Sequence, residues 1–172
     1  MANARFGAFA AAGAGTEQFE TLENDLVKIT FSTKGGAIKE VFLKKFEKIS
    51  ADTAGVETKN PVRLLEDSKN RFEYELPVMG TAAGKVLSSE LFFTAAKNGN
   101  TITFRADAGQ GRYFEQRYTL RADDYAIDYQ VSGNGLQNVL SQQQLRLNWV
   151  NHLDKLEKNQ TYERTMSSVY FK

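Results

Sequence analysis

Residues 26–43 carry the first strong strand and turn pattern of the sequence and read Leu-Val-Lys-Ile-Thr-Phe-Ser-Thr-Lys-Gly-Gly-Ala-Ile-Lys-Glu-Val-Phe-Leu. From Val27 to Phe31, apolar and polar side chains alternate, which is the period of a strand with one buried face. The pair Gly35-Gly36 allows the positive φ angles of a tight turn, because glycine has no Cβ to clash. Residues 37–43 then return as a second strand, so this stretch predicts a β-hairpin.

Further strand patterns follow along the chain, separated by turn-forming residues. Short apolar or alternating runs occur at residues 62–65, 72–76, 90–94, 101–105, 113–120, 125–131, 145–150 and 168–171. Turn chemistry occurs at residues 52–55, 60–61, 97–100, 109–111, 121–124 and 133–135. Residues 151–167 are predicted to be helical or irregular, with Asp154 as a candidate helix cap. Short strands at near-regular spacing predict an all-β, antiparallel sandwich with little helix.

Composition limits the classes of function. The 172 residues make one ordinary domain, or a piece of one. The net charge of +1 provides no large basic field for nucleic acid. The absence of cysteine excludes disulfides, thiol nucleophiles and cysteine-ligated zinc. A single histidine leaves almost no material for a histidine-based triad or a multi-histidine metal site, and no stretch approaches the ~18 apolar residues of a membrane span.

The N-terminal residues 5–15, Arg-Phe-Gly-Ala-Phe-Ala-Ala-Ala-Gly-Ala-Gly, differ from the rest in composition. They weakly mimic a signal peptide, but alanine and glycine replace the leucine and isoleucine of an apolar signal core. We therefore interpret residues 1–18 as a flexible linker and residues 19–172 as the β-sandwich domain.

An ordered set of segments resembles a known family. Residues 21–36, Thr-Leu-Glu-Asn-Asp-Leu-Val-Lys-Ile-Thr-Phe-Ser-Thr-Lys-Gly-Gly, are similar to the opening strand of the periplasmic domain of YidC-type (Oxa-family) membrane protein insertases. Other segments resemble later strands of that domain, namely residues 38–46, 116–120, 125–129 and 145–149. Residues 7–10 resemble its linker. The resemblance covers most of residues 16–172.

This resemblance implies a fold and a function. The fold is an antiparallel β-supersandwich of the mutarotase-like type, present whole or as a truncated portion whose C-terminal part is missing. Residues 1–18 would then be the tether after a transmembrane helix that this sequence lacks. The implied role is a non-catalytic interaction domain, without cofactor, on the periplasmic side of the bacterial inner membrane. Its implied partners are nascent membrane proteins and Sec translocon components, and the full protein would be membrane-tethered. The alternative hypothesis is a carbohydrate-binding or mutarotase-like β-sandwich.

One histidine and a pair of aspartates are candidates for chemistry. His152 would need a carboxylate within ~3 Å to act as an acid or base, and Asp154 and Glu157 are the nearest in sequence. The other interpretation of His152 is a surface or packing residue. Asp123-Asp124 is interpreted as turn chemistry rather than as part of a glycosidase pair.

Basic, aromatic and glycine clusters complete the candidates. Lys44, Lys45 and Lys48 are either a solvated strand end or a contact with lipid head groups. Four aromatic residues are predicted to lie in the sandwich core, and the alternative is that they line a sugar or peptide groove: Tyr118, Tyr125, Tyr129 and Trp149. Neither Gly35-Gly36 nor Gly109-Gln-Gly111 has the residues of a phosphate loop. The sequence thus assigns no catalytic, cofactor or metal residue and leaves any binding residues unassigned.

Overall fold

A computed structural model describes residues 2–51, 57–65, 68–152 and 160–166. Most of the regular structure in these residues is β-strand. The strands are β1 (Phe19–Glu23), β2 (Val27–Ser32), β3 (Ala37–Ala51), β4 (Glu57–Leu64), β5 (Arg71–Leu76), β6 (Val86–Leu87), β7 (Thr94–Asn98), β8 (Thr101–Asp107), β9 (Tyr113–Leu120), β10 (Ile127–Asn134) and β11 (Arg146–Val150). The helical elements are α1 (Ala2–Phe6), η1 (Gly7–Phe9), η2 (Ser88–Glu90), η3 (Leu136–Asn138) and α2 (Gln160–Met166).

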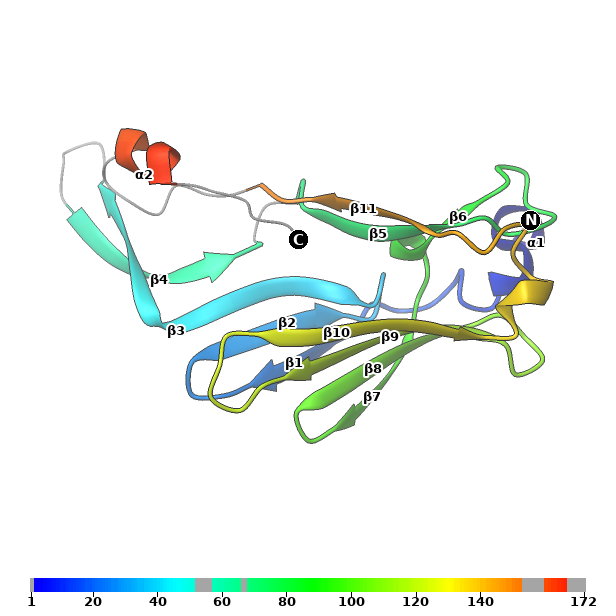
Figure 1. The fold of residues 1–172 in the computed structure, drawn as a ribbon, viewed down its shortest axis with the longest axis horizontal. Coiled ribbons are helices and arrows are strands. Elements are labelled where there is room, and N and C mark those ends of the chain that lie inside the picture. The colour runs from blue at the N-terminus through cyan, green and yellow to red at the C-terminus, as the bar shows by residue number, and fades with distance from the viewer. Residues whose placement is uncertain (1, 52–56, 66–67, 153–159, 167–172) are drawn as a thin grey trace.

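The strands form three antiparallel sheets. Their strand orders are β1-β2-β3-β4, β10-β9-β8-β7 and β11-β5-β6. Figure 1 shows β5 and β11 along one side of the molecule, β7, β8 and β9 along the other, and the β3–β4 hairpin extending at the end away from the N-terminus. The arrangement confirms the prediction of an all-β antiparallel fold.

The sheet of β7 to β10 packs its apolar face against both other sheets. Phe31 of β2 contacts Phe104 and Tyr118, with ring centroids 5.7 and 4.9 Å apart. Tyr74 of β5 contacts Phe114 at 5.6 Å. These rings are buried, and aromatic side chains of this size contribute strongly to core burial. The core therefore joins strands that are far apart in the sequence.

The predicted hairpin forms as expected. β2 pairs with β3, and Gly35 and Gly36 adopt φ angles of 86° and 60° in the turn. The predicted Asn-Gly turn joins β7 to β8, with Gly99 at a φ of 57°. The strands expected at residues 72–76, 101–105, 113–120 and 145–150 are also present, as β5, β8, β9 and β11.

The prediction of turn chemistry at Asn60-Pro61 was wrong. Both residues lie inside β4, and β3 continues to Ala51, beyond the predicted end at residue 43. Pro61 is tolerated because β4 is an edge strand and Pro61 stands opposite Glu47, next to a shift in the β3–β4 register. Residues 52–55, another predicted turn, lie outside the described residues.

Residues 90–94 do not form the predicted strand. Glu90 ends η2, and Phe92 makes only an isolated bridge with Lys34 before β7 begins at Thr94. The segment crosses the β2–β3 hairpin, and its backbone pairs there through Gly35 N donating to Leu91 O at 2.8 Å. Local alternation could not reveal this crossing. Strand β1 (residues 19–23) was not predicted. Strand β10 begins later than predicted and continues to Asn134, through the predicted break at Gly133.

The N-terminal segment differs from the flexible linker expected for residues 1–18. Phe9 is fully buried and Phe6 is buried, both within the hydrophobic core. Phe92 N donates a 2.7 Å hydrogen bond to Ala12 O, and Arg5 forms a 2.6 Å ion pair with Glu90. Two phenylalanines among alanines supply enough apolar surface to dock the segment on the sandwich.

The C-terminal part is described only in pieces. Helix α2 lies within the stretch 151–167 that was expected to be helical or irregular. Asp154, the candidate cap, and the strand expected at residues 168–171 lie outside the described residues. No helix among the described residues is long and apolar enough to cross a membrane.

Candidate functional site

A groove of about 1610 Å³ opens where the three sheets meet. One wall is the first half of β3 with the end of β4, and the other is β5 with β11. Side chains of β9 and β10 form its floor. The groove exists because the β11-β5-β6 sheet is separate from the β1-β2-β3-β4 sheet. No described residue fills the space between these two sheets.

Two tyrosines from neighbouring strands lie at the floor. Tyr118 of β9 and Tyr129 of β10 are paired in register, and their ring centroids are 4.8 Å apart. Tyr118 is buried, whereas Tyr129 is half-buried. Burial raises the pKa of both hydroxyls, because an ionised phenolate would lose its hydration. Both side chains therefore stay neutral and present a hydrogen-bonding, aromatic floor rather than a base.

A buried glutamine joins these tyrosines to the β2–β3 turn. Gln116 Nε2 donates to Gly35 O at 2.8 Å, and Gln116 Oε1 accepts the Tyr129 hydroxyl at 2.9 Å. The Tyr118 hydroxyl donates to Gly36 O at 2.9 Å. These bonds satisfy polar groups that burial would otherwise leave without partners. The network fixes the floor of the groove against the turn.

Apolar side chains with high exposure lie on the β11 wall. Trp149 is 69% exposed and contacts Phe72 of β5, with ring centroids 5.9 Å apart. Leu147 and Val150 are also exposed and line the groove. The prediction that Trp149 lies in the core was therefore wrong, as was that for Tyr125, which is exposed. The alternation of β11 was correctly predicted, but no described element covers the face of β11 that carries Trp149.

The acidic residues that line the groove have partners, whereas two of its lysines form no ion pair with a described residue. Its acids are already engaged: Glu17 accepts from the Ser32 hydroxyl, Glu73 from the Ser89 hydroxyl, and Glu90 pairs with Arg5. Those three acids and the basic residues Lys34, Lys39, Arg63, Arg71 and Arg164 all line the groove. Within the described chain, neither Lys34 nor Lys39 forms an ion pair. The border therefore carries available positive charge.

His152 lies on an exposed loop at the end of the groove. Its backbone N–H donates to Asn70 Oδ1 at 2.6 Å, and its imidazole makes no hydrogen bond or ion pair with another described residue. Asp154 and Glu157 lie outside the described residues. The structure thus brings no described carboxylate to His152. Likewise, no group of three acidic or histidine side chains in the described chain is placed to hold a metal ion.

Asp123-Asp124 forms a turn, as predicted. Asp124 Oδ1 accepts from Ala126 N at 3.2 Å, and Asn24 Nδ2 donates to the Asp124 carbonyl at 2.8 Å. These bonds hold the turn before β10 against the turn before β2. The aspartates are accounted for by this structural role.

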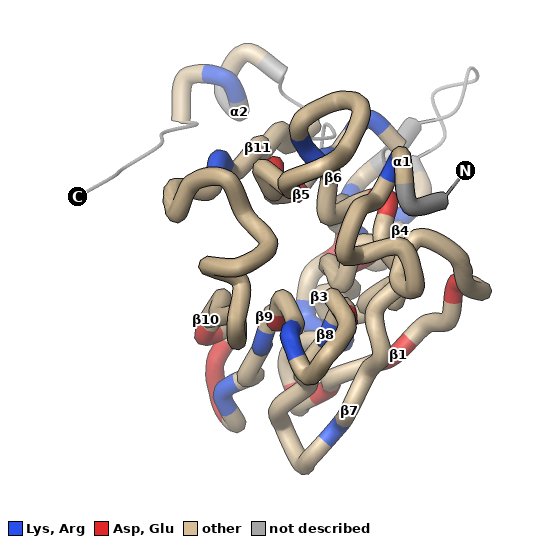
Figure 2. The backbone as a smooth tube through the Cα atoms, turned by 90° about the vertical axis from the view of Figure 1, so that its right-hand side faces the viewer, with Lys and Arg blue, Asp and Glu red and all other residues tan. Residues whose placement is uncertain are grey.

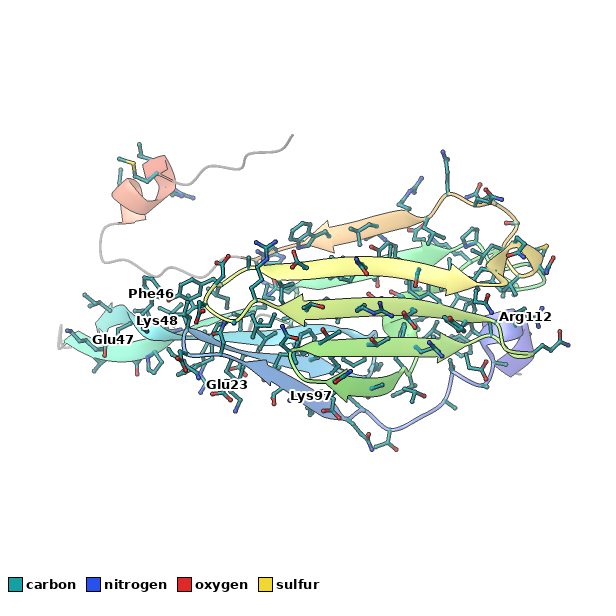
Figure 3. The ribbon with its side chains drawn as sticks, turned by 60° about the horizontal axis from the view of Figure 1, so that its bottom comes forward. Glu23, Phe46, Glu47, Lys48, Lys97 and Arg112 are labelled. Carbon is teal, nitrogen blue, oxygen red and sulfur yellow. The ribbon has the colours of Figure 1, made fainter. Side chains whose placement is uncertain are left out.

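The three lysines of the basic cluster lie on β3 at the end away from the N-terminus. Lys44 forms a 2.7 Å ion pair with Glu23, and this bond lowers the pKa of the Glu23 carboxyl. Figure 3 shows Phe46, Glu47 and Lys48 together at this end, with Glu23 nearby. Acids thus lie among the lysines, which favours the solvated strand end over a purely basic lipid contact. Figure 2 shows the same mixture of acidic and basic residues along β7 to β10.

Gln116 is the residue that the sequence analysis missed. It stands at an inward position of β9, because strand alternation places it on the same buried face as Phe114 and Tyr118. A polar residue at such a position was the available signal, because a buried amide requires hydrogen-bond partners.

The geometry defines an antiparallel β-sandwich with an open, aromatic groove. Comparison with protein families then identifies the class more narrowly, because the family model of the YidC periplasmic domain matches residues 20–172. The chain belongs to this family. The expected resemblance to YidC-type insertases is thereby confirmed.

Relatives from several bacteria support the assignment. Membrane protein insertase YidC of Parabacteroides distasonis is 33% identical over 172 residues, covering 97% of this chain and 25% of the relative. The YidC of Azobacteroides pseudotrichonymphae is 33% identical, and the match covers 97% of this chain and 26% of the relative. The YidC of Chlorobaculum parvum is 28% identical, and the match covers 95% of this chain and 28% of the relative. The chain spans about a quarter of the length of these relatives. No solved structure matches the chain significantly.

Proposed function

We propose that this chain is a non-catalytic interaction domain of a bacterial membrane protein insertase, and that it works on the periplasmic side of the inner membrane. The family match over residues 20–172 carries the proposal, because relatives with this domain are named membrane protein insertases. The domain assists the insertion and folding of membrane proteins by binding them or the Sec translocon. A membrane tether would keep it close to both.

The surface of the sandwich supports a binding role. The exposed Leu147, Trp149 and Val150 of β11 line the groove, together with the half-buried Ile127 and Tyr129 of β10. Figure 2 shows both acidic and basic residues along β7 to β10. Exposed apolar groups beside a groove are typical of interaction sites. The two floor tyrosines stay neutral, so they offer apolar contact and hydrogen bonds rather than acid–base chemistry.

Photo-crosslinking in cells tests the proposal. A photoreactive amino acid would replace an exposed residue in the full-length, membrane-bound protein, at Val131 or Leu147 beside the groove and at Gln130 on the outer face. We expect crosslinks to pulse-labelled membrane proteins or to translocon subunits from at least one position. Failure to capture either class from any of the three positions would contradict the proposed function.

The alternative function, a mutarotase-like or carbohydrate-binding domain, is favoured by one observation: the aromatic groove has His152 at its border. Against catalysis, the only described carboxylate of β5 that lines the groove, Glu73, is buried and bound to Ser89. Polarimetry of freshly dissolved α-D-glucose separates the two functions. We expect the same rate of mutarotation with the protein, with His152→Ala and with buffer. An acceleration that His152→Ala abolishes would favour the alternative.

A further inference from the structure

The N-terminal strap, which we define as residues 4–18, is attached to the sandwich along its whole length. Main-chain hydrogen bonds attach it at three places, pairing Ala4 with Ala82, Ala12 with Phe92 and Gln18 with Thr33. The donor–acceptor distances of these bonds are 2.9, 2.7 and 2.9 Å. The strap therefore follows a defined path over the sandwich and ends at the β2–β3 turn.

Small residues let the strap approach its neighbours closely. An added Cβ at Gly13 would lie 2.3 Å from the Phe6 ring, and one at Gly15 would lie 2.8 Å from Phe92 Cβ. Neither glycine has a positive φ angle, so space rather than backbone conformation requires glycine at both positions. The alanine- and glycine-rich composition that suggested a linker therefore serves close packing.

Few buried side chains hold the strap in place. Of its described side chains, those of Phe6, Phe9 and Ala12 alone are buried. A hollow of about 510 Å³ is lined by the strap on one side and by the first residues of β7 on another. Segments with few buried contacts open at a lower free energy than the rest of a fold. We therefore expect the strap to be released more easily than the sandwich unfolds.

The β2–β3 turn is the place where the strap and the segment before β7 both attach. Thr33 is buried; its N–H donates to Gln18 O, and its hydroxyl accepts from Gln18 N at 2.8 Å. The segment before β7 holds the same turn, because Gly35 N donates to Leu91 O and Phe93 N donates to Thr33 O, both at 2.8 Å. The strap thus supports the turn directly and through this segment.

The other side of the turn carries the floor of the groove. Gly35 O accepts from the Gln116 amide, and Gly36 O accepts from the Tyr118 hydroxyl. Gln116 in turn accepts the Tyr129 hydroxyl. A displaced turn would leave these buried groups without partners, and buried polar groups without partners cost free energy. The positions of the turn and of the floor are therefore linked.

We propose that the N-terminal strap is a latch for the groove floor. Its docking holds the β2–β3 turn in place and thereby fixes Gln116, Tyr118 and Tyr129, and its release loosens all three. A force on the strap, or a partner that binds its released form, changes the floor without contacting it, because both states of the floor depend on the same turn. This inference goes beyond the proposed function and does not depend on what the domain binds.

Native-state hydrogen exchange of the full chain, with Gly13→Ala, tests the latch. The new Cβ must displace the Phe6 ring, and it introduces no charge. Three amides report on the strap, the segment before β7 and the turn: Phe92, Phe93 and Gly35. We expect their exchange to accelerate by a common factor of about ten. The Leu120 amide, which is bonded to Asn100 O beside the β7–β8 turn, should keep its rate.

The pattern of exchange decides between the outcomes. Acceleration at Phe92 alone would show that the strap opens without moving the turn and would overturn the inference. An equal acceleration at Leu120 would show global destabilisation and would also overturn it. Phe6→Leu loosens the strap by removing packing instead of adding a clash, so it should give the same pattern as Gly13→Ala. Gly99→Ala, the control in the β7–β8 turn, should accelerate Leu120 more than the three reporters.

A change at the floor should in turn release the strap, because coupling between two sites is reciprocal. Tyr129→Phe keeps the ring but removes the hydroxyl that Gln116 accepts. Exchange at the Phe92 amide should then accelerate several-fold. Tyr125→Phe is the matched control, since the exposed Tyr125 hydroxyl makes no hydrogen bond with another described residue, and it should leave Phe92 unchanged. Equal effects of the two substitutions, or no effect of Tyr129→Phe, would overturn the latch.

Discussion

Gln116 Nε2 donates a 2.8 Å hydrogen bond to the carbonyl oxygen of Gly35, across 81 residues of sequence. The same amide accepts the Tyr129 hydroxyl, so one side chain connects the β2–β3 turn, the β9 strand and the floor of the groove. Since Gln116 is 1% exposed, water cannot replace either partner. The stability of the turn and the shape of the groove floor are therefore coupled.

Replacing Gln116 by leucine should destabilise the fold. The substitution removes a partner from Gly35 O and from the Tyr129 hydroxyl, and each buried polar group left unpaired costs about 1–3 kcal/mol. We expect a loss of about 2 kcal/mol or more, measured by urea unfolding with an unchanged m-value. Gln130→Leu, exposed on neighbouring β10, is the matched control and should change stability little. Equal effects of the two substitutions would contradict the role of the network.

The turn at Gly36 should tolerate alanine poorly. Its φ of 60° alone costs alanine about 1–2 kcal/mol, and an added Cβ would lie 2.8 Å from Gln116 Nε2 and 3.0 Å from Phe104 Cβ. Gly99→Ala has the same backbone cost, with a φ of 57°, but its Cβ would meet nothing within 4 Å. The difference between the two unfolding free energies isolates the steric conflict. Gly36→Ala should lower the unfolding free energy more than Gly99→Ala does. An equal or smaller loss for Gly36→Ala would contradict the steric conflict.

Truncation of Phe9 tests whether the N-terminal segment is part of the packed domain. Phe9 is fully buried, and Phe→Ala in a core typically costs about 3–5 kcal/mol. We expect a loss in this range by thermal or urea unfolding, with Phe19→Ala, a largely exposed site on β1, close to neutral. A stability unchanged by Phe9→Ala would instead indicate the flexible linker that the composition suggested.

Titration of Asp128 should reveal its ion pair. The hydrogen bond from Arg121, followed by the charge of that guanidinium, lowers the pKa of the Asp128 carboxyl below its ordinary value of 3.8. A group with a lowered folded pKa stabilises the fold above its unfolded pKa, and this contribution is lost as the pH falls through the folded pKa. NMR titration should give a midpoint below 3.8 that Arg121→Gln raises. A midpoint insensitive to Arg121→Gln would contradict the pairing.

Much of the fold could be predicted because strands and turns leave local marks. Alternation identified β2, β9 and β11, and the Gly35-Gly36 and Asn98-Gly99 pairs identified two of the turns. Segments whose structure depends on distant partners were not predicted. Residues 90–94 have the composition of a strand, but they cross the hairpin and pair with Lys34 only as an isolated bridge. Pro61 lies in a strand only because β4 is an edge.

The site was less predictable than the fold. The aromatic residues at 118, 129 and 149 were all recognised as inward-facing, but their burial ranges from 2% exposed at Tyr118 to 69% at Trp149. Periodicity reports which face of a strand is apolar, and it does not report whether another sheet covers that face. The groove consequently appears only when the sheets are assembled.

Residue identity and spacing within a few positions were enough to predict the all-β class, the β2–β3 hairpin, the lack of cysteine chemistry and the family resemblance. The packing of the sheets, by contrast, places Phe9 in the core, connects the turn to the groove floor through Gln116 and leaves Trp149 exposed. Those features depend on contacts between residues tens of positions apart, and sheet packing, rather than local backbone preference, brings such residues together.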